Sequence, residues 1–204
     1  LRALSDLVIT AALKALPMPK SGFDRDRFWR ESHLTGAVAE ALMRRLSLPL
    51  NPDEVFLSGC LCNVGKLVMA YCFPPLATKV SRDVDDPEVL VTWRKAETAY
   101  NFPDHCVLGE IASTLWGFPE YIMFAARRHH EVPSGGRLRD LDLGDLVAFA
   151  NQMTHWIMLR PHRIEYEVIR GFQAKSGLSE TEVEKIALEL GALRRHLEAT
   201  AASA

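Results

Sequence analysis

The chain has 204 residues, 48% of them hydrophobic and 25% charged, which is the composition of an ordinary globular protein. Its formal net charge of −2 argues against the basic surface with which a protein binds nucleic acid. No apolar run reaches the roughly 18 residues that span a bilayer, and the start of the chain lacks the pattern of a secretory signal. We therefore expect a cytoplasmic protein, with neither a membrane nor a nucleic acid as partner.

Apolar residues recur at helical spacing along the chain, and no segment alternates for long enough to predict a strand. Most predicted helices begin at a polar capping residue or a proline, and Ser179 with Glu182 forms a capping box. In chain order, the predicted helices are 3–16, one from Asp24 to about Leu46, one from Asn51-Pro52 to Pro74-Pro75, one opened by Asp86-Pro87-Glu88, one from Asp104 to Gly117, one from Pro119 to His130, 143–159, 165–175, and a last one after Ser179. The fold class is therefore expected to be nearly all α.

The cysteines lie in apolar helical segments and show no paired CxxC spacing. We expect buried free thiols at all of these positions, which are Cys60, Cys62, Cys72 and Cys106. A zinc hook at Cys60 and Cys62 is a weak alternative, because side chains two positions apart on a helix point about 200° away from each other.

Several segments together resemble the HDOD family, the HD-related output domains of bacterial signalling proteins. The segments are Phe28 to Ser32, Phe56 to Leu67, Asp104-His105 with Gly109, Trp116 to Pro119, and His129 to Glu131. The resemblance runs over 1–204 and implies one helical bundle of the HD-like type, usually without demonstrated catalysis, that acts in signal transduction through protein contacts. The family also has an N-terminal helical half, which we expect to precede Leu1, so the chain would be the C-terminal, HD-like portion.

The resemblance also implies a set of metal positions, most of which carry altered residues here. The first His position falls on Glu31, the His-Asp pair on Cys62 and Asn63, a further His on His105, the paired His on His129 and His130, and the late Asp on Asn151. A neutral amide binds metal poorly, and a thiol must lose its proton before it binds and then prefers zinc. We therefore predict a remnant pocket with no catalytic residue, no metal and no cofactor.

Helix geometry predicts that Glu31 faces the interior, because at about 100° per residue it falls on the apolar stripe of Phe28, Val38 and Leu42. A buried carboxylate needs a partner or a proton, and His105, His129 or His130 can supply one. Two alternatives stay open: zinc held by Glu31, Cys62 and one or two histidines, or a pocket filled by water or a small polar ligand.

Other polar residues receive plainer interpretations. We expect His33, His155 and His162 to be solvated, and the tryptophans to pack in the core. Lys66 after Gly65 lacks the rest of a phosphate-binding loop and lies in a helix, so it predicts no site by itself.

The leading functional hypothesis is a non-catalytic regulatory module that contacts a signalling partner or the missing domains of its own chain. The main rival is a metal-dependent phosphohydrolase or phosphodiesterase of HD ancestry with a rearranged metal set. A third hypothesis keeps the pocket as a nucleotide sensor without turnover. The sequence names neither the partner nor the oligomeric state.

Overall fold

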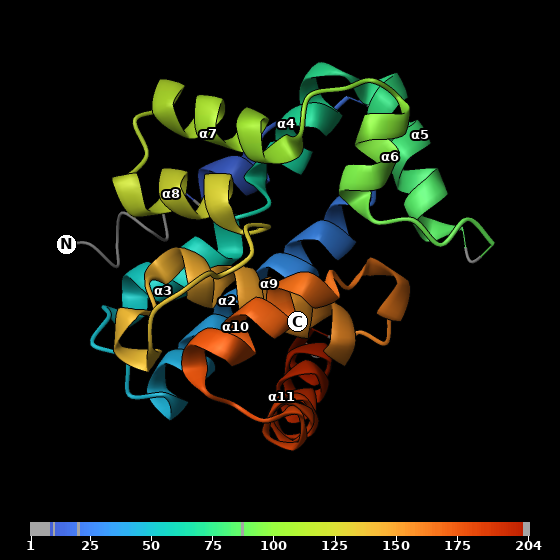
Figure 1. Ribbon diagram of the computed structural model, residues 1–204. Helices are drawn as coiled ribbons and strands as arrows, with labels where there is room; N and C mark the ends of the chain where they lie inside the picture. The colour runs from blue at the N-terminus through green and yellow to red at the C-terminus, as the bar shows by residue number, and fades with distance from the viewer. Residues whose placement is uncertain (1–8, 10, 20, 87, 202–204) are drawn as a thin grey trace.

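The computed structural model describes residues 9, 11–19, 21–86 and 88–201, with side chains described through residue 192. These residues form α-helices joined by short loops and contain no strand, which confirms the all-α prediction (Figure 1). The α-helices are α2 (Arg25–Arg45), α3 (Pro52–Leu61), α4 (Val64–Cys72), α5 (Pro74–Asp85), α6 (Trp93–Ala99), α7 (His105–Leu115), α8 (Glu120–Arg128), α9 (Leu143–Ile157), α10 (Tyr166–Ser176) and α11 (Glu180–Ala201), with short 3-10 turns at Leu138–Asp140 and Pro161–Arg163.

Capping side chains start the helices where the sequence predicts them. Asp24, Asn51 and Asp104 each accept a hydrogen bond at 2.8–2.9 Å from a backbone N–H in the first turn of the following helix. At the start of α11, Glu182 accepts from the Ser179 backbone N–H at 2.8 Å while its own N–H donates to Ser179 Oγ. The chain therefore enters α2, α3, α7 and α11 at the predicted residues.

The predicted helix between Asn51 and Pro74 is wrong in one respect. Cys62 and Asn63 form a turn that divides it into α3 and α4. The second part ends before Pro74, as predicted, and Pro74 begins α5, because a proline at the first helical position gives up no hydrogen bond. The next helix begins later than predicted, since α6 is capped by Thr92 and not opened at Asp86.

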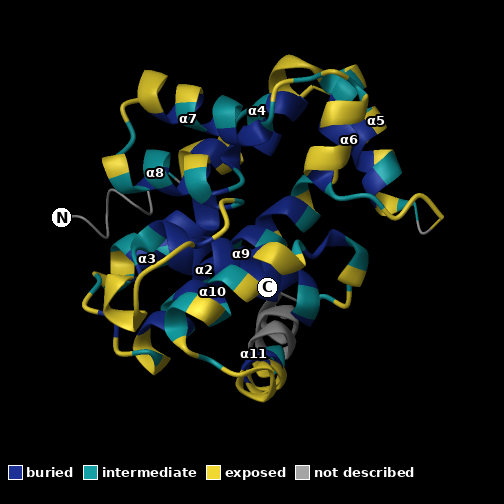
Figure 2. Cartoon of the chain, in the orientation of Figure 1, coloured by how far each residue is buried: buried dark blue, intermediate teal, exposed yellow. Residues whose placement is uncertain are grey.

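Helix α9 forms the centre of the lower half of the molecule in Figure 1. It is buried along nearly its whole length, as its dark colour in Figure 2 shows, and it packs against α2, α10 and α11. Phe149 of α9 stacks on Phe172 of α10 with ring centroids 4.0 Å apart. An apolar face of α2 and a fully buried α9 therefore build the largest core.

The upper half consists of α4 to α8, and two glycines let α4 and α7 cross at backbone contact. A Cβ atom on Gly65 would overlap the His105 carbonyl oxygen and lie 2.8 Å from the Gly109 backbone nitrogen. This crossing fixes His105, the first residue of α7, against α4.

Among the described residues, Pro52–Cys72 is long and apolar enough to be a membrane span. However, 72% of its most apolar window is buried inside the protein, as in the core helix of a folded domain. The cytoplasmic location stays a prediction.

Candidate functional site

Three histidines converge where the start of α7 meets the end of α8. His105 Nε2 lies 3.1 Å from His129 Nε2 and 3.2 Å from His130 Nε2. His105 and His129 are fully buried, and the His130 side chain is 8% exposed. The structure thus brings together three of the predicted site residues, which we call the histidine cluster.

The outer nitrogen of each histidine has a hydrogen-bond partner. His129 Nδ1 lies 2.9 Å from the Ala126 carbonyl, and His130 Nδ1 lies 2.6 Å from Glu165 Oε2. His105 Nδ1 lies 3.0 Å from Glu97 Oε2. Such outer partners orient imidazoles in metal sites and fix their tautomers. Sequence analysis missed Glu97 and Glu165, because neither lies in a motif that resembles the family.

Hydrogen bonding assigns the protons of the cluster. A carbonyl only accepts, so His129 carries its proton on Nδ1 and presents a lone pair at Nε2. His130 donates from Nδ1 to Glu165, and this hydrogen bond lowers the pKa of Glu165. His130 therefore also has a lone pair on Nε2. His105 Nε2 must therefore donate, and its Nδ1 then accepts a hydrogen bond from the Glu97 carboxyl group.

Burial supports this arrangement, because desolvation lowers the pKa of His105 and His129 well below the ordinary value. Burial also raises the pKa of Glu97, so that its carboxyl group retains a proton. Glu97 Oε1 accepts from Trp93 Nε1 at 2.9 Å and from the His105 backbone N–H, which leaves Oε2 to carry that proton. The three Nε2 atoms thus share one proton, on His105.

The histidine cluster also has the dimensions of a single cation site. Ligand atoms about 2.0 Å from a tetrahedral zinc ion lie roughly 3.3 Å from one another, close to the two Nε2 separations given above. Cys106 Sγ belongs to the same group, within 4.8 Å of the histidine ligand atoms, although burial raises the pKa of its thiol. Bound there, a cation would act as a Lewis acid or brace the three helical segments. The residues whose spacing fits a cation are therefore His105, His129 and His130 with Cys106. Glu31 and Cys62, named in the zinc alternative, are not among them.

Cys62 is not part of this cluster. Its side chain is fully buried in an apolar cluster with Ala125 and Val147, and its Sγ donates to the Gly59 carbonyl at 3.2 Å. Burial raises the pKa of the Cys62 thiol to about 12, so the thiol is protonated in this apolar setting. The prediction that Cys62 lines the remnant pocket is wrong, because the break between α3 and α4 turns it into the core. The prediction of free buried thiols holds except at Cys72, which is exposed.

Asn63 and Asn151 bond to each other. The Asn63 amide nitrogen donates to Asn151 Oδ1 at 2.9 Å, and both side chains border a cavity of about 20 Å³ together with Ser32. Asn63 Oδ1, Asn151 Nδ2 and Ser32 Oγ have no protein partner among the described residues, and the cavity is large enough for one water that could bond them. The two amides thus meet as predicted, but in a closed pair.

Glu31 faces the interior of the protein, but its predicted histidine partner is wrong. Its side chain is 21% exposed and forms an ion pair with Arg160, while Arg27 and Arg163 nitrogens lie 3.9 Å from Oε1. Arg160 lies 129 positions further along the chain than Glu31. The position of Glu31 on its own helix therefore could not indicate this partner. His130 borders the same cavity as Glu31 without an ion pair to it.

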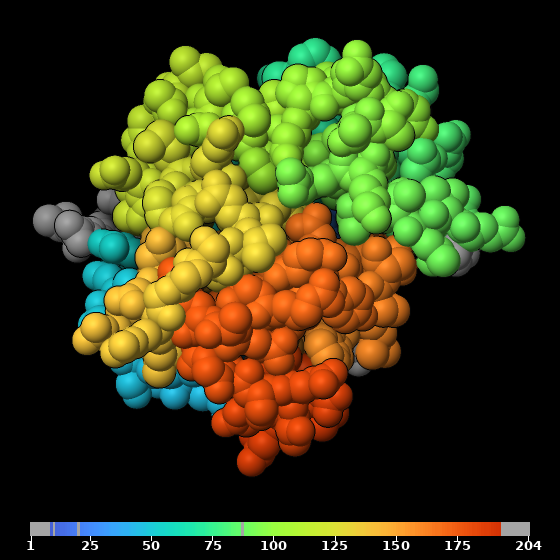
Figure 3. All heavy atoms as spheres, viewed as in Figure 1, coloured from blue at the N-terminus to red at the C-terminus, as the bar shows by residue number. Residues whose placement is uncertain are grey.

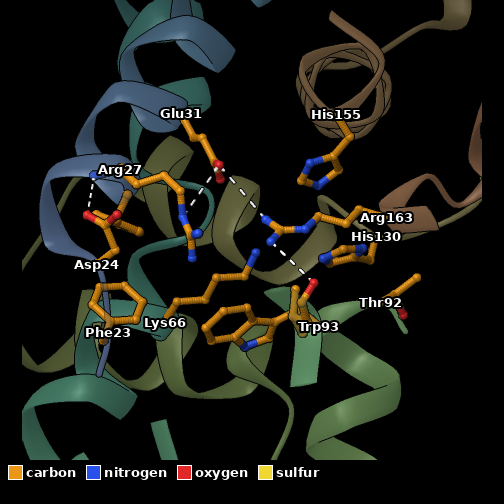
Figure 4. A pocket seen from close by; sticks show the side chains of 12 residues that line it. Phe23, Asp24, Arg27, Glu31, Lys66, Thr92, Trp93, His130, His155 and Arg163 are labelled. Atoms are coloured by element: carbon orange, nitrogen blue, oxygen red, sulfur yellow. Dashed lines mark hydrogen bonds and ion pairs between the residues drawn. The ribbon is translucent and has the colours of Figure 1, made fainter. Parts of the chain in front are cut away.

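This second cavity, of about 40 Å³, lies between α2, α4, α6 and α9 (Figure 4). Lys66 Nζ and the Arg163 guanidinium point into it, and Lys66 lies 5.1 Å from the ring centroid of Trp93. His155 also lines it and is only 8% exposed, so the expectation of a solvated His155 is wrong. His33 is half-buried and bonds the Trp29 carbonyl, which corrects a similar expectation.

A wider cleft of about 710 Å³ opens beside the histidine cluster. It is lined by residues of α6 and the following loop, by His130, and by residues 164–168 at the start of α10. In Figure 3 these green, yellow and orange segments meet near the middle of the view. His130 and Thr92 line both this cleft and the 40 Å³ cavity, so the two adjoin.

Comparison with known proteins adds a family match. The family model described as the HDOD domain matches residues 1–132, which include all predicted site residues except Asn151. An uncharacterized protein of Treponema pallidum (strain Nichols) is 23% identical over 162 residues, a match that covers 77% of this chain. The chain spans 30% of the length of that relative.

Two solved structures share the fold. An HDOD domain protein of unknown function from Geobacter sulfurreducens superposes with a TM-score of 0.60 and 21% identity, over 87% of this chain and 64% of the other. A protein of Shewanella amazonensis SB2B named a putative phosphohydrolase gives a TM-score of 0.65 at 20% identity, over 97% of this chain and 71% of the other. Similarity of the fold therefore extends beyond residue 132.

Proposed function

Because the chain belongs to the HDOD domain family, we propose that it is a non-catalytic regulatory module of signal transduction that acts through protein contacts. The observation that carries this proposal is the state of the former His-Asp pair. Cys62 packs in an apolar cluster, and Asn63 is bonded to Asn151. The partner is a signalling protein or a further domain of the same protein.

The charges around the 40 Å³ cavity also disfavour a catalytic pair of metal ions. A two-metal centre needs carboxylates between cations about 3.5–4 Å apart. Glu31, which faces this region, is already paired with Arg160 and lies near Arg27 and Arg163, while Lys66 adds a further positive charge. Repulsion from these groups would oppose divalent ions there.

Exposed apolar side chains at the end of α7 provide the surface for testing the proposal. Leu115 is 78% exposed and Trp116 is 46% exposed, which corrects the expectation that every tryptophan packs in the core. Apolar surface of this kind commonly contributes to protein interfaces.

The test is co-purification of binding partners with the full-length protein in its native host, comparing Leu115→Ser with Cys62→Ala. We expect the surface variant to lose partners and the core variant to keep them in whatever protein stays folded. If a folded Cys62→Ala protein loses its partners while surface variants keep theirs, contact is not the function of this module.

A metal-dependent phosphohydrolase is the second candidate. It is favoured by the histidine cluster beside the 710 Å³ cleft and by the name of the Shewanella structure. Elemental analysis together with phosphodiesterase assays in manganese and magnesium would separate the candidates, and we expect no turnover. Turnover that His129→Ala abolishes and Cys62→Ala retains would establish the enzyme instead.

A further inference from the structure

The 40 Å³ cavity contains buried polar nitrogens without hydrogen-bond partners among the described residues. Arg163 Nε and His155 Nδ1 are buried and have no hydrogen-bond partner among the described residues. Lys66 is 9% exposed and packs over the face of Trp93. Among the described residues it makes no ion pair within 4.0 Å. A buried donor without an acceptor is costly, and a buried charge without a counter-charge is more so.

The carboxylates near the cavity are engaged elsewhere. Glu31 pairs with Arg160, and Asp85 bridges Arg27 and Arg163. Asp24 caps α2 by accepting from the Arg27 backbone N–H at 2.8 Å. Lys66 thus makes no direct ion pair within the described residues; burial lowers its pKa, and the nearby Glu31 and Glu97 side chains oppose that shift.

From these contacts we propose that the cavity binds the phosphate group of a small anion, with Lys66, Arg163 and His155 as its donors. At roughly 10–15 Å³ per water-sized atom, 40 Å³ holds about three oxygen atoms. The 710 Å³ cleft shares Thr92 and His130 with this cavity, so the fourth oxygen or an ester group has room on that side. Both inorganic phosphate and a phosphomonoester such as a nucleoside monophosphate present this chemistry.

The inference goes beyond the proposed function, because a contact module needs no ligand. The two are also separable by experiment, since phosphate binding is measured on the purified protein without any partner. Binding without effect on partner contacts would leave both statements standing.

The experiment is a titration of the purified chain with inorganic phosphate, followed by phosphorus NMR and by thermal unfolding at constant ionic strength. We expect saturable binding and a rise in Tm that chloride does not reproduce. In Lys66→Met the affinity should fall by about tenfold to a hundredfold, the usual effect of losing a charge-assisted hydrogen bond.

Lys79→Met is the matched control, because Lys79 is exposed and the variant makes the same change of charge. If Lys66→Met fails to fold, His155→Leu replaces it, with a smaller loss of affinity expected. Absence of saturable phosphate binding by the wild type overturns the proposal, as does equal binding by Lys66→Met and Lys79→Met.

Adenosine monophosphate and adenosine form the second arm. Tighter binding of the monophosphate than of inorganic phosphate, with no binding of adenosine, assigns the ligand as a phosphomonoester that extends into the cleft. Equal affinity for the monophosphate and phosphate assigns the free anion. Binding of adenosine that Lys66→Met leaves unchanged contradicts a phosphate site.

Discussion

The two halves of the predicted remnant pocket differ in their surroundings. On the Cys62 side, a thiol packs against Ala125 and Val147, and two amides bond to each other. On the histidine side, three imidazoles converge, and each outer nitrogen has a hydrogen-bond partner. The Cys62 side holds a buried thiol and a closed amide pair, whereas the other side holds three imidazoles and the groups that orient them. The residues at the family's metal positions therefore differ in chemistry between the two sides of one pocket.

The largest expected effect comes from the frame that both sides share. Gly65→Ala would place a Cβ atom against the backbone of α7, which cannot yield as a flexible side chain can. We expect a loss of about 3 kcal/mol or more in the free energy of unfolding, measured by urea denaturation. Gly191→Ala is the control, since its Cβ would meet nothing within 4 Å and should stabilise α11 by up to about 1 kcal/mol. Equal stability of Gly65→Ala and the wild type would contradict the close crossing of α4 and α7.

Acid should destabilise the protein chiefly through its buried histidines. The pKa of His105, His129 and His155 is lowered by burial, so below about 6.5 the unfolded chain takes up protons that the folded chain refuses. Their contribution is present above that pH and is lost as the pH falls, by up to about 1.4 kcal/mol per histidine for each pH unit. Glu97, whose raised pKa has the opposite effect, offsets one of these protons.

The measurement is the free energy of unfolding between pH 7.5 and 5, and we expect a net fall toward acid. His129→Phe should reduce the slope by about one proton if it folds. A stability that rises toward pH 5 would contradict the neutral state assigned to the cluster.

Zinc should distinguish the two sides directly. If added zinc binds, we expect it at the histidine cluster, with stabilisation of about 2.7 kcal/mol when free zinc is a hundred times its Kd. His129→Ala should abolish this increase and Cys62→Ala should retain it, as followed by thermal unfolding with and without a chelator. Loss of zinc binding in Cys62→Ala alone would support the alternative in which Glu31, Cys62 and one or two histidines hold zinc. We still predict no divalent metal at Cys62 and Asn63, and anomalous scattering there would refute this.

The smallest effect is expected on the apolar side. Cys62→Ala should lower the free energy of unfolding by about 1–3 kcal/mol, because it removes a buried side chain and leaves a small cavity. Cys72→Ala, at an exposed position, should change it by less than about 0.5 kcal/mol. Comparable losses in the two variants would show that Cys62 does not lie in the core.

Local signals predicted much of the fold. The caps at Asp24, Asn51 and Asp104 depend on a side chain and the next few backbone groups, so a short stretch of sequence determines them. The turn at Cys62 and Asn63 was not predictable in this way, because its amide partner is 88 positions away.

The site was predictable only in part, for the same reason. The three histidines were identified by their resemblance to a family, and they do meet. Glu97 reaches His105 across a helix start, and Arg160 reaches Glu31 from beyond the end of α9. Lys66 lies three residues after Asn63, on the same side of α4, which is the one local signal that indicates its place in the cavity.

The single proton that the three histidines share allows the cluster to be complete without a metal. The N–H at His105 Nε2 donates a hydrogen bond at the place where a cation would otherwise lie. His105 Nδ1 carries no proton and accepts a hydrogen bond from the protonated Glu97 carboxyl group. The histidine cluster therefore satisfies its own hydrogen bonds without a cation. Zinc, where it is plentiful, would have to displace a proton to enter, so occupancy would report the cell's metal supply and acidity and would not decide whether the protein folds.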